Sequence, residues 1–289
     1  MIGYLSLMTH PKGSNYQANS MKIGLSSYTY TWSVGVLGSM PERPLTAKGI
    51  IDKAVESQLD LVQIADNLPL EKFSEGELND LVTYSSHRKI EIQMGSRGMT
   101  PEHILECLKT ADSLKSPILR MVIDGQNFEP GIQEISAIIK DLLPEFKSRN
   151  ISLAIENHDR FKAREFEKII QNAGSDMVGI CLDSVNSMGA GEGFEEVAQI
   201  LLPYTINFHV KDFTIRRVSH KMGIIIEGAP AGKGKLNIVE VVAQLKEAGR
   251  CQSAILELWT PPESLIEDTI IKEDKWALES IEYLKKIIT

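Results

Sequence analysis

Four ionisable side chains in the second half of the chain each follow a short, mainly apolar segment. They are Glu156, Asp183, His209 and Glu257. Burial of a charged group is costly unless another charge or a metal ion compensates for it. Three carboxylates and one imidazole form an oxygen-rich ligand set that suits Mn²⁺, Mg²⁺ or Co²⁺, with Zn²⁺ as an alternative. The residue types therefore predict one bound divalent metal ion, for which we favour Mn²⁺, provided that the fold brings the four side chains together.

The segments that precede these residues belong to a repeated pattern. Short apolar runs alternate with amphipathic stretches eight times along the chain. The predicted strands cover Lys22–Ser27, Leu59–Ala65, Ile90–Met94, Ile118–Ile123, Ile151–Glu156, Val178–Asp183, Thr205–Val210 and Ala254–Leu258. Eight such units in 289 residues match a single α/β domain, the (β/α)₈ or TIM barrel, whose active sites lie at the carboxyl ends of the strands. The four ionisable residues stand at those ends on the last four predicted strands.

An open, doubly wound sheet is the rival architecture. Its dinucleotide-binding form carries a glycine-rich turn after the first strand, whereas the first predicted strand here leads into Ser26-Ser27-Tyr28-Thr29-Tyr30. Helix boundaries also agree with the alternating pattern. Ser74 and Glu77 form a capping-box signature, and Gly174 and Gly249 stand where two predicted helices end.

The chain shows no linker or change of composition after residue 20. We therefore predict an N-terminal extension over residues 1–20 and one barrel domain over residues 21–289. The first 20 residues lack the basic start and the longer apolar stretch of a signal peptide. Three scattered cysteines are too few for a disulfide framework. These features predict a cytoplasmic protein.

The charge balance restricts the partners. The chain has 31 Lys and Arg against 39 Asp and Glu, a formal net charge of −8. Sequence-independent nucleic-acid binding needs an excess of basic groups to neutralise phosphates. No apolar run reaches the length of a membrane-spanning helix. We therefore expect neither a nucleic acid nor a membrane as a partner.

Strand alternation places further side chains beside the four ionisable residues. His158, Lys211 and Trp259 each stand two residues after one of them, on the same face of a strand. We expect His158 and Lys211 to hold substrate hydroxyls or a developing oxyanion, although Lys211 could instead form a salt bridge with a neighbouring carboxylate. Trp259 could form an apolar wall against a sugar ring or simply pack. Arg97 and Asp124, after the third and fourth predicted strands, are weaker candidates.

Five short motifs together resemble the xylose isomerase-like barrel superfamily and, within it, the sugar phosphate isomerase/epimerase branch. The motifs are Glu156-Asn157-His158-Asp159-Arg160-Phe161, Cys181-Leu182-Asp183-Ser184, His209-Val210-Lys211-Asp212, Gly232-Lys233-Gly234 and Leu256-Glu257-Leu258-Trp259. The resemblance extends over the whole predicted barrel from Met21. It implies that Glu156, Asp183, His209 and Glu257 bind one divalent metal ion, and that the two glutamates also act as catalytic acid and base.

The resemblance implies an isomerase or epimerase of carbohydrate metabolism whose partner is a small sugar or sugar phosphate. One glutamate would remove a proton from the carbon beside the carbonyl, giving a metal-stabilised enediolate, and the other would return a proton. Return to the same carbon gives an epimerase. Return to the neighbouring carbon gives an isomerase.

Three positions depart from the pattern of ketose 3-epimerases. Those enzymes carry a second glutamate six residues after the strand-five glutamate, a histidine three residues after the strand-six aspartate, and an arginine six residues after the strand-seven histidine. The corresponding residues here are Lys162, Asn186 and Ile215, and Arg216 is the neighbouring arginine. We expect Asn186 and Arg216 to contact the substrate, and we do not expect efficient epimerisation of a free ketohexose.

Other functions remain open at this stage. A metal-dependent dehydratase of a cyclic keto-polyol, such as an inosose, would use the same metal and base. An AP endonuclease-like DNA repair hydrolase is a remote alternative, because that branch uses three zinc ions and many histidines, and this chain has 6 histidines. A non-catalytic sugar-binding barrel is a third alternative. The segment Arg216–Gly228 is long enough for a hairpin that covers the site or contacts a second subunit, which would make the protein a homo-oligomer.

Overall fold

The computed structural model describes residues 21–288, so the extension predicted for residues 1–20 lies outside the described residues. The parallel strands are β1 (Lys22–Ser26), β2 (Leu61–Ile64), β3 (Glu91–Arg97), β4 (Ile118–Val122), β5 (Ser152–Glu156), β6 (Val178–Asp183), β7 (Thr205–Val210) and β10 (Ser253–Leu256). They close into a barrel in the order β1-β10-β7-β6-β5-β4-β3-β2. The single (β/α)₈ barrel predicted from the sequence is confirmed.

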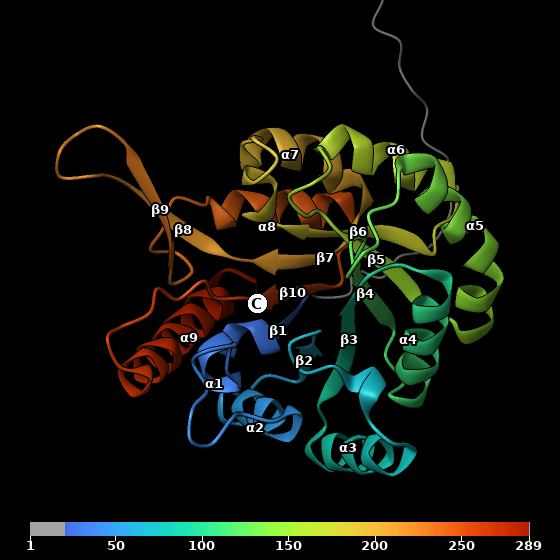
Figure 1. Ribbon diagram of the computed structural model, residues 1–289, viewed down its shortest axis with the longest axis horizontal. Coiled ribbons are helices and arrows are strands. Elements are labelled where there is room, and N and C mark those ends of the chain that lie inside the picture. The colour runs from blue at the N-terminus through green and yellow to red at the C-terminus, as the bar shows by residue number, and fades with distance from the viewer. Residues whose placement is uncertain (1–20, 289) are drawn as a thin grey trace, which may run out of the picture.

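Helices surround the barrel and connect successive strands (Figure 1). The α-helices are α1 (Thr31–Val34), α2 (Ala47–Glu56), α3 (Glu75–Arg88), α4 (Pro101–Ser113), α5 (Ile132–Arg149), α6 (Ala163–Ala173), α7 (Phe194–Leu201), α8 (Ile238–Ala248) and α9 (Ile266–Ile288). Their apolar faces pack on the outside of the strands in one continuous core. Within residues 21–288, no helix is long and apolar enough to cross a membrane.

The predicted helix boundaries are confirmed at three positions. Ser74 and Glu77 form a reciprocal capping box at the start of α3, in which each side chain accepts a hydrogen bond from the other residue's backbone N–H. Gly174 and Gly249 end α6 and α8 in the left-handed conformation, with φ of 60° and 72°. A side chain at either position would be strained, which is why glycine marks these ends in the sequence.

Strand β3 is longer at its carboxyl end than the apolar pattern predicted. The predicted strand ended at Met94, but β3 continues to Arg97, because Gly95, Ser96 and Arg97 pair with β4. Directly after β3, the backbone N–H groups of Gly98 and Met99 also donate hydrogen bonds to the chain at the end of β4. This extension carries Arg97 to the carboxyl end of the barrel.

A layer of polar side chains fills the barrel interior below the carboxyl ends of the strands. Gln63, Gln93, Asn207 and Ser253 come from β2, β3, β7 and β10, and all four are buried. The Gln63 amide donates hydrogen bonds to Gln93 Oε1 at 3.3 Å and to Asn207 Oδ1 at 3.2 Å, and Asn207 donates to Ser253 Oγ at 2.7 Å. These four residues, here called the polar layer, form a hydrogen-bonded floor beneath the strand ends.

An antiparallel hairpin interrupts the alternation after β7. Its strands are β8 (Asp212–Arg217) and β9 (Ile224–Ala229), and it projects away from the barrel (Figure 1). The carboxylate of Asp212 accepts hydrogen bonds from the backbone N–H groups of Gly232 and Gly234 at 2.9 and 2.8 Å. The base of the hairpin is therefore tied to the turn that leads into α8. A hairpin in the predicted segment Arg216–Gly228 is confirmed, but it begins earlier, at Asp212, and ends at Ala229.

Candidate metal centre

The structure brings the four predicted metal ligands together at the carboxyl end of the barrel. Glu156 ends β5, Asp183 ends β6, His209 lies in β7 and Glu257 directly follows β10, and these four strands are consecutive neighbours in the barrel. Asp183 pairs in register with His209, and the Glu257 backbone N–H still bonds to β7, at 3.0 Å from the Val210 oxygen. All four side chains are buried, with at most 2% exposed.

His209 is at the centre of the cluster. Its Nδ1 atom lies 3.3 Å from Glu156 Oε2, 3.4 Å from Glu257 Oε1 and 3.9 Å from Asp183 Oδ2. These contacts are longer than metal–ligand bonds, but they place one nitrogen and three carboxylates around a common point. Side chains on opposite sides of one coordination sphere have donor atoms separated by such distances.

The protonation of His209 is fixed by Gln63. The Nε2 atom lies 2.6 Å from Gln63 Oε1. The amide nitrogen of Gln63 donates to the polar layer, so the amide oxygen is the atom that faces His209, and an amide oxygen can only accept a hydrogen bond. Nε2 therefore carries the proton, and the lone pair of Nδ1 points at three carboxylates. Among residues 21–288 this buried Nδ1 has no hydrogen-bond partner. Lone pairs that face one another in a buried site fit a bound cation, so the donor set fits a divalent metal ion.

Two permanent cations flank the cluster. Lys211 Nζ lies 2.9 Å from Asp183 Oδ2 and 3.0 Å from Glu257 Oε2. The buried Arg120, on β4, forms ion pairs with Glu156 and, at 3.3 Å, with Asp66. Among the described side chains of this network, four carboxylates thus face two cations. The excess of two negative charges equals the charge of one divalent ion.

Ion pairs determine the charge states of Glu257 and Lys211. Burial raises the pKa of Glu257, but the positive charges of Lys211 and Arg120 act in the opposite direction, and the pKa lies below its ordinary value. Burial lowers the pKa of Lys211, but Asp183 and Glu257 outweigh it, so the pKa lies above its ordinary value. Glu257 is therefore a carboxylate and Lys211 an ammonium group near neutral pH. The alternative of a salt bridge for Lys211 is confirmed.

A cavity of about 570 Å³ opens above the cluster. Four of the predicted substrate contacts line it, namely His158, Lys211, Asn186 and Trp259. Asn186 Nδ2 donates to Glu156 Oε1 at 2.7 Å, so this residue also orients a predicted metal ligand. His158 Nδ1 pairs with Asp159 at 2.6 Å. Trp259, with 43% of its surface exposed, lies at the rim.

Arg216 does not line this cavity. It lies on β8, where its Nε atom donates to Glu227 Oε2 across the hairpin at 2.9 Å, and 56% of its side chain is exposed. The register of β8 against β9 sets this direction, and the spacing from His209 alone did not reveal it. The expectation that Arg216 contacts the substrate is thus not supported, because Arg216 pairs with Glu227 outside the cavity.

The sequence interpretation missed Arg120 and Asp66, which line the cavity together with Tyr28. Tyr28 donates to Asp66 Oδ2 at 3.1 Å, and Asp66 pairs with Arg120. The signal was present for Arg120, because one arginine interrupts the otherwise apolar strand Ile118–Val122. A charged residue inside a buried strand indicates a buried partner.

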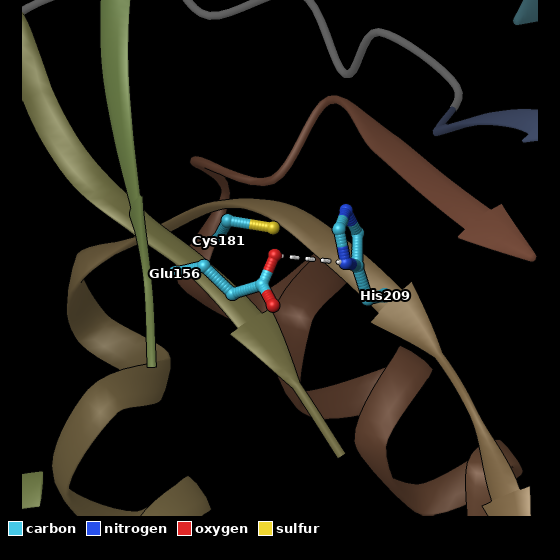
Figure 2. A group of neighbouring side chains, drawn as sticks. All are labelled: Glu156, Cys181 and His209. Atoms are coloured by element: carbon cyan, nitrogen blue, oxygen red, sulfur yellow. Dashed lines mark ion pairs between the residues drawn. The ribbon is translucent and has the colours of Figure 1, made fainter. Parts of the chain in front are cut away.

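Cys181 borders the cluster from β6. Figure 2 shows its sulfur directed toward the Glu156 carboxylate and the His209 ring, and one ligand atom from each of these three residues lies within 4.8 Å of the others. The thiol donates a hydrogen bond to Asn207 Oδ1 at 3.1 Å. Burial raises the pKa of this thiol. Cys181 is therefore a neutral neighbour of the four predicted ligands.

Comparison with known proteins places the chain in a family. A family model described as a xylose isomerase-like TIM barrel matches residues 98–287. The chain belongs to the xylose isomerase-like TIM barrel family. The resemblance to the xylose isomerase-like barrels, inferred from the five motifs, is therefore confirmed.

Three similar proteins show what this xylose isomerase-like barrel resembles. A 3-oxo-isoapionate decarboxylase of Pectobacterium atrosepticum is 29% identical over 264 residues, which cover 91% of this chain and 95% of the relative. A D-psicose 3-epimerase, solved with D-fructose, is 15% identical with a TM-score of 0.70 over 93% of this chain and 99% of its own. A Mycobacterium smegmatis xylose isomerase-like barrel, solved with magnesium, is 14% identical with a TM-score of 0.64 over the same shares. At such low identity the two solved structures establish the fold alone.

Proposed function

We propose that this protein is a divalent-metal-dependent enzyme that acts on a keto-sugar acid and removes its carboxyl group as CO₂. The observation that carries the proposal is the pairing of both glutamates with permanent cations. Glu156 is bound by Arg120, and Glu257 by Lys211. A carboxylate held by a cation in this way is a weak base, and decarboxylation of a 3-oxo acid needs no base.

The metal would be held by Glu156, Asp183, His209 and Glu257. When bound, a divalent ion would polarise the substrate carbonyl and offset the negative charge that develops on its oxygen. The oxygen-rich donor set favours a hard ion, and we keep Mn²⁺ as the first candidate with Mg²⁺ next. The thiol of Cys181 is neutral and does not alter this preference for a hard ion.

The chain's own residues would assist the reaction in two ways. Loss of CO₂ breaks the bond between the carboxyl carbon and its neighbour, and the electron pair passes to the keto group. Lys211 Nζ, a charged donor on the cavity wall, can hydrogen-bond to the oxygen where this charge collects. The carbon that lost CO₂ then takes one proton. The 29% identical decarboxylase, matched over nearly its full length, supports this reaction class.

Isomerisation or epimerisation of a keto-sugar is the second candidate. The observation that favours it is that two glutamates lie beside the same atom. His209 Nδ1 is 3.3 Å from Glu156 Oε2 and 3.4 Å from Glu257 Oε1. Such a pair could remove and return a proton on either side of a substrate. A dehydratase would share the proton removal and differ in the product.

The test supplies the Mn²⁺-loaded protein with a panel of 3-oxo sugar acids, ketoses and keto-inositols in D₂O. We expect CO₂ release from a 3-oxo acid, with one deuterium per product molecule, and no efficient turnover of free fructose, psicose or tagatose. Deuterium exchange into a ketose without CO₂ release would replace the proposal with the second candidate. Loss of water from a keto-inositol would replace it with the dehydratase. The control is the same protein after removal of metal with a chelator, which should be inactive.

A further inference from the structure

The cavity above the metal centre carries a positive charge that no hydrogen bond or ion pair within residues 21–288 takes up. Three permanently charged cations line this cavity, namely Arg97, Arg120 and Lys211. Arg120 is paired with Glu156 and Asp66, and Lys211 bridges Asp183 and Glu257, as described above. The side chain of Arg97 forms no hydrogen bond and no ion pair within residues 21–288, although its charge adds to the effect of His158 in lowering the pKa of Asp159. Its guanidinium group is therefore available to a ligand.

The backbone of Arg97 is held firmly although its side chain is exposed. Arg97 is the last residue of β3 and pairs in register with Val122 of β4. The next two residues continue the attachment, because the N–H groups of Gly98 and Met99 donate to the carbonyl oxygens of Val122 and Ile123, both at 2.9 Å. A fixed backbone limits the positions that the guanidinium can reach, so less freedom is lost when it binds a ligand.

Arg97 and His209 stand on opposite sides of the barrel mouth. In the closed barrel β3 is four strands from β7 in either direction, so Arg97 lies across from His209. Asp183 and Glu257 belong to the two neighbours of β7, namely β6 and the end of β10, and Glu156 is on β5, two strands from both β3 and β7. Arg97, Glu156 and Glu257 line one cavity of about 570 Å³, so a single small molecule with its carbonyl at the metal centre can also contact Arg97.

We propose that Arg97 binds an anionic oxyacid group of the substrate, a carboxylate or a phosphate, so that the natural substrate is a sugar acid or a sugar phosphate. A guanidinium presents a planar fork of N–H donors that matches the paired oxygens of both groups. The carboxylate at this part of the cavity mouth, Asp159, is itself paired with His158 at 2.6 Å. The inference rests on the proposed function for the position of the carbonyl, but the selection of an anion by Arg97 can be tested separately.

The test uses three probes with the same five-carbon chain, namely ribitol, D-ribonate and D-ribitol 5-phosphate. Each is titrated by calorimetry into the full-length Mg²⁺-loaded protein. We expect at least one anionic probe to bind about tenfold more tightly than ribitol, which is the lower end for a hydrogen bond to a charged group. Tighter binding of ribonate identifies a carboxylate, and tighter binding of ribitol 5-phosphate identifies a phosphate.

Arg97→Met should reduce this preference to within about twofold of ribitol, and Arg97→Lys should retain part of it, because lysine keeps the charge but loses the fork. The matched control is Arg43→Met, because Arg43 is also exposed and does not line the cavity. This variant should keep the full preference. A preference that survives Arg97→Met, as a carboxylate bound only at the metal would produce, overturns the proposal. Equal binding of all three probes, or no binding of any at about 10 mM, also overturns it.

The metal titration separates this inference from the proposed function. Arg97→Met should bind Mg²⁺ with the affinity of the wild type, because Arg97 contacts none of the four predicted ligands. If the anion preference depends on Arg97 but no 3-oxo acid, ketose or keto-inositol reacts, the proposed function fails and the assignment of Arg97 stands. If CO₂ release occurs and the anion preference is absent, the proposed function stands and the assignment of Arg97 fails.

Discussion

Gln63 controls the metal centre without being one of its predicted ligands, and Gln63→Leu is the most direct test of the site's geometry. The substitution removes the amide oxygen that accepts from His209 Nε2 at 2.6 Å. The imidazole can then move its proton to Nδ1, which lies 3.3 Å from Glu156 and 3.4 Å from Glu257 and could donate to either. In that tautomer the nitrogen that faces the carboxylates has no lone pair for a metal.

The size of the effect follows from the cost of the correct tautomer in the variant. Metal binding would require the proton on Nε2, where it would be buried without an acceptor, at a cost of about 1–3 kcal/mol. This cost corresponds to a rise in the Kd of about 5- to 150-fold, which agrees with the usual 10- to 100-fold effect of residues that orient metal-binding histidines. We therefore expect Mn²⁺ to bind Gln63→Leu about 10- to 100-fold more weakly than the wild type.

The assay is calorimetric titration of Mn²⁺ into chelator-treated protein, and Gln93→Leu is the matched control. Gln93 belongs to the same polar layer and is equally buried, but it does not contact His209. Both variants leave amide groups of the layer unpaired and should lose similar thermal stability. Only Gln63→Leu should lose metal affinity, with Gln93→Leu within about threefold of the wild type. Equal affinities in all three proteins would refute the argument, and so would equal losses in the two variants.

Three further predictions concern the ligands, the ion pairs and the pH. Asp183→Asn should lose activity by weakening metal binding, so excess Mn²⁺ in the assay should restore part of the rate; no recovery at any concentration would contradict this. Arg120→Met leaves the carboxylate of Glu156 buried without its cation and should lower the free energy of unfolding by about 3–5 kcal/mol in urea titrations without metal. A loss below about 1 kcal/mol would mean that the pair is not buried as described. Burial raises the pKa of Glu273, on α9, to about 7, so the folded state holds a proton that an unfolded glutamate releases near pH 4.3. The free energy of unfolding should therefore fall by up to about 3 kcal/mol as the pH rises from about 5 to about 8, and Glu273→Gln should flatten that slope; an unchanged slope would show that another group titrates.

The parts that the sequence predicted well depend on local patterns. The alternation of strands and helices is visible in short windows, and an ionisable residue directly after an apolar strand marks the carboxyl end of a barrel strand. Glu156 and Asp183 could be found for that reason. Arg120 and Asp66 could not be assigned roles, because their pairing joins β4 to the segment after β2 and depends on closure of the barrel.

Errors in the prediction arose where long-range pairing decides the structure. The carboxyl end of β3 is set by its ladder with β4 and not by its own composition. The direction of Arg216 is set by its partner strand, which places Glu227 beside it. The same reasoning explains why Arg97 looked like an ordinary loop charge in the sequence. The lack of a hydrogen-bond or ion-pair partner for its side chain among residues 21–288 becomes visible only when the surrounding side chains are placed.

The hairpin of β8 and β9 is a segment where the sequence can change in evolution without altering the strand that carries His209. Its base is tied down by Asp212, one residue after Lys211, whereas the connecting residues 218–223 lie at the end that projects from the barrel. Ile226 of β9 lines the cavity wall. Insertions, deletions and substitutions beyond Asp212 can therefore reshape the rim through Ile226 and leave the strand that carries His209 unchanged. A lineage can explore new substrates through this segment while the ligand set that performs the chemistry is inherited intact.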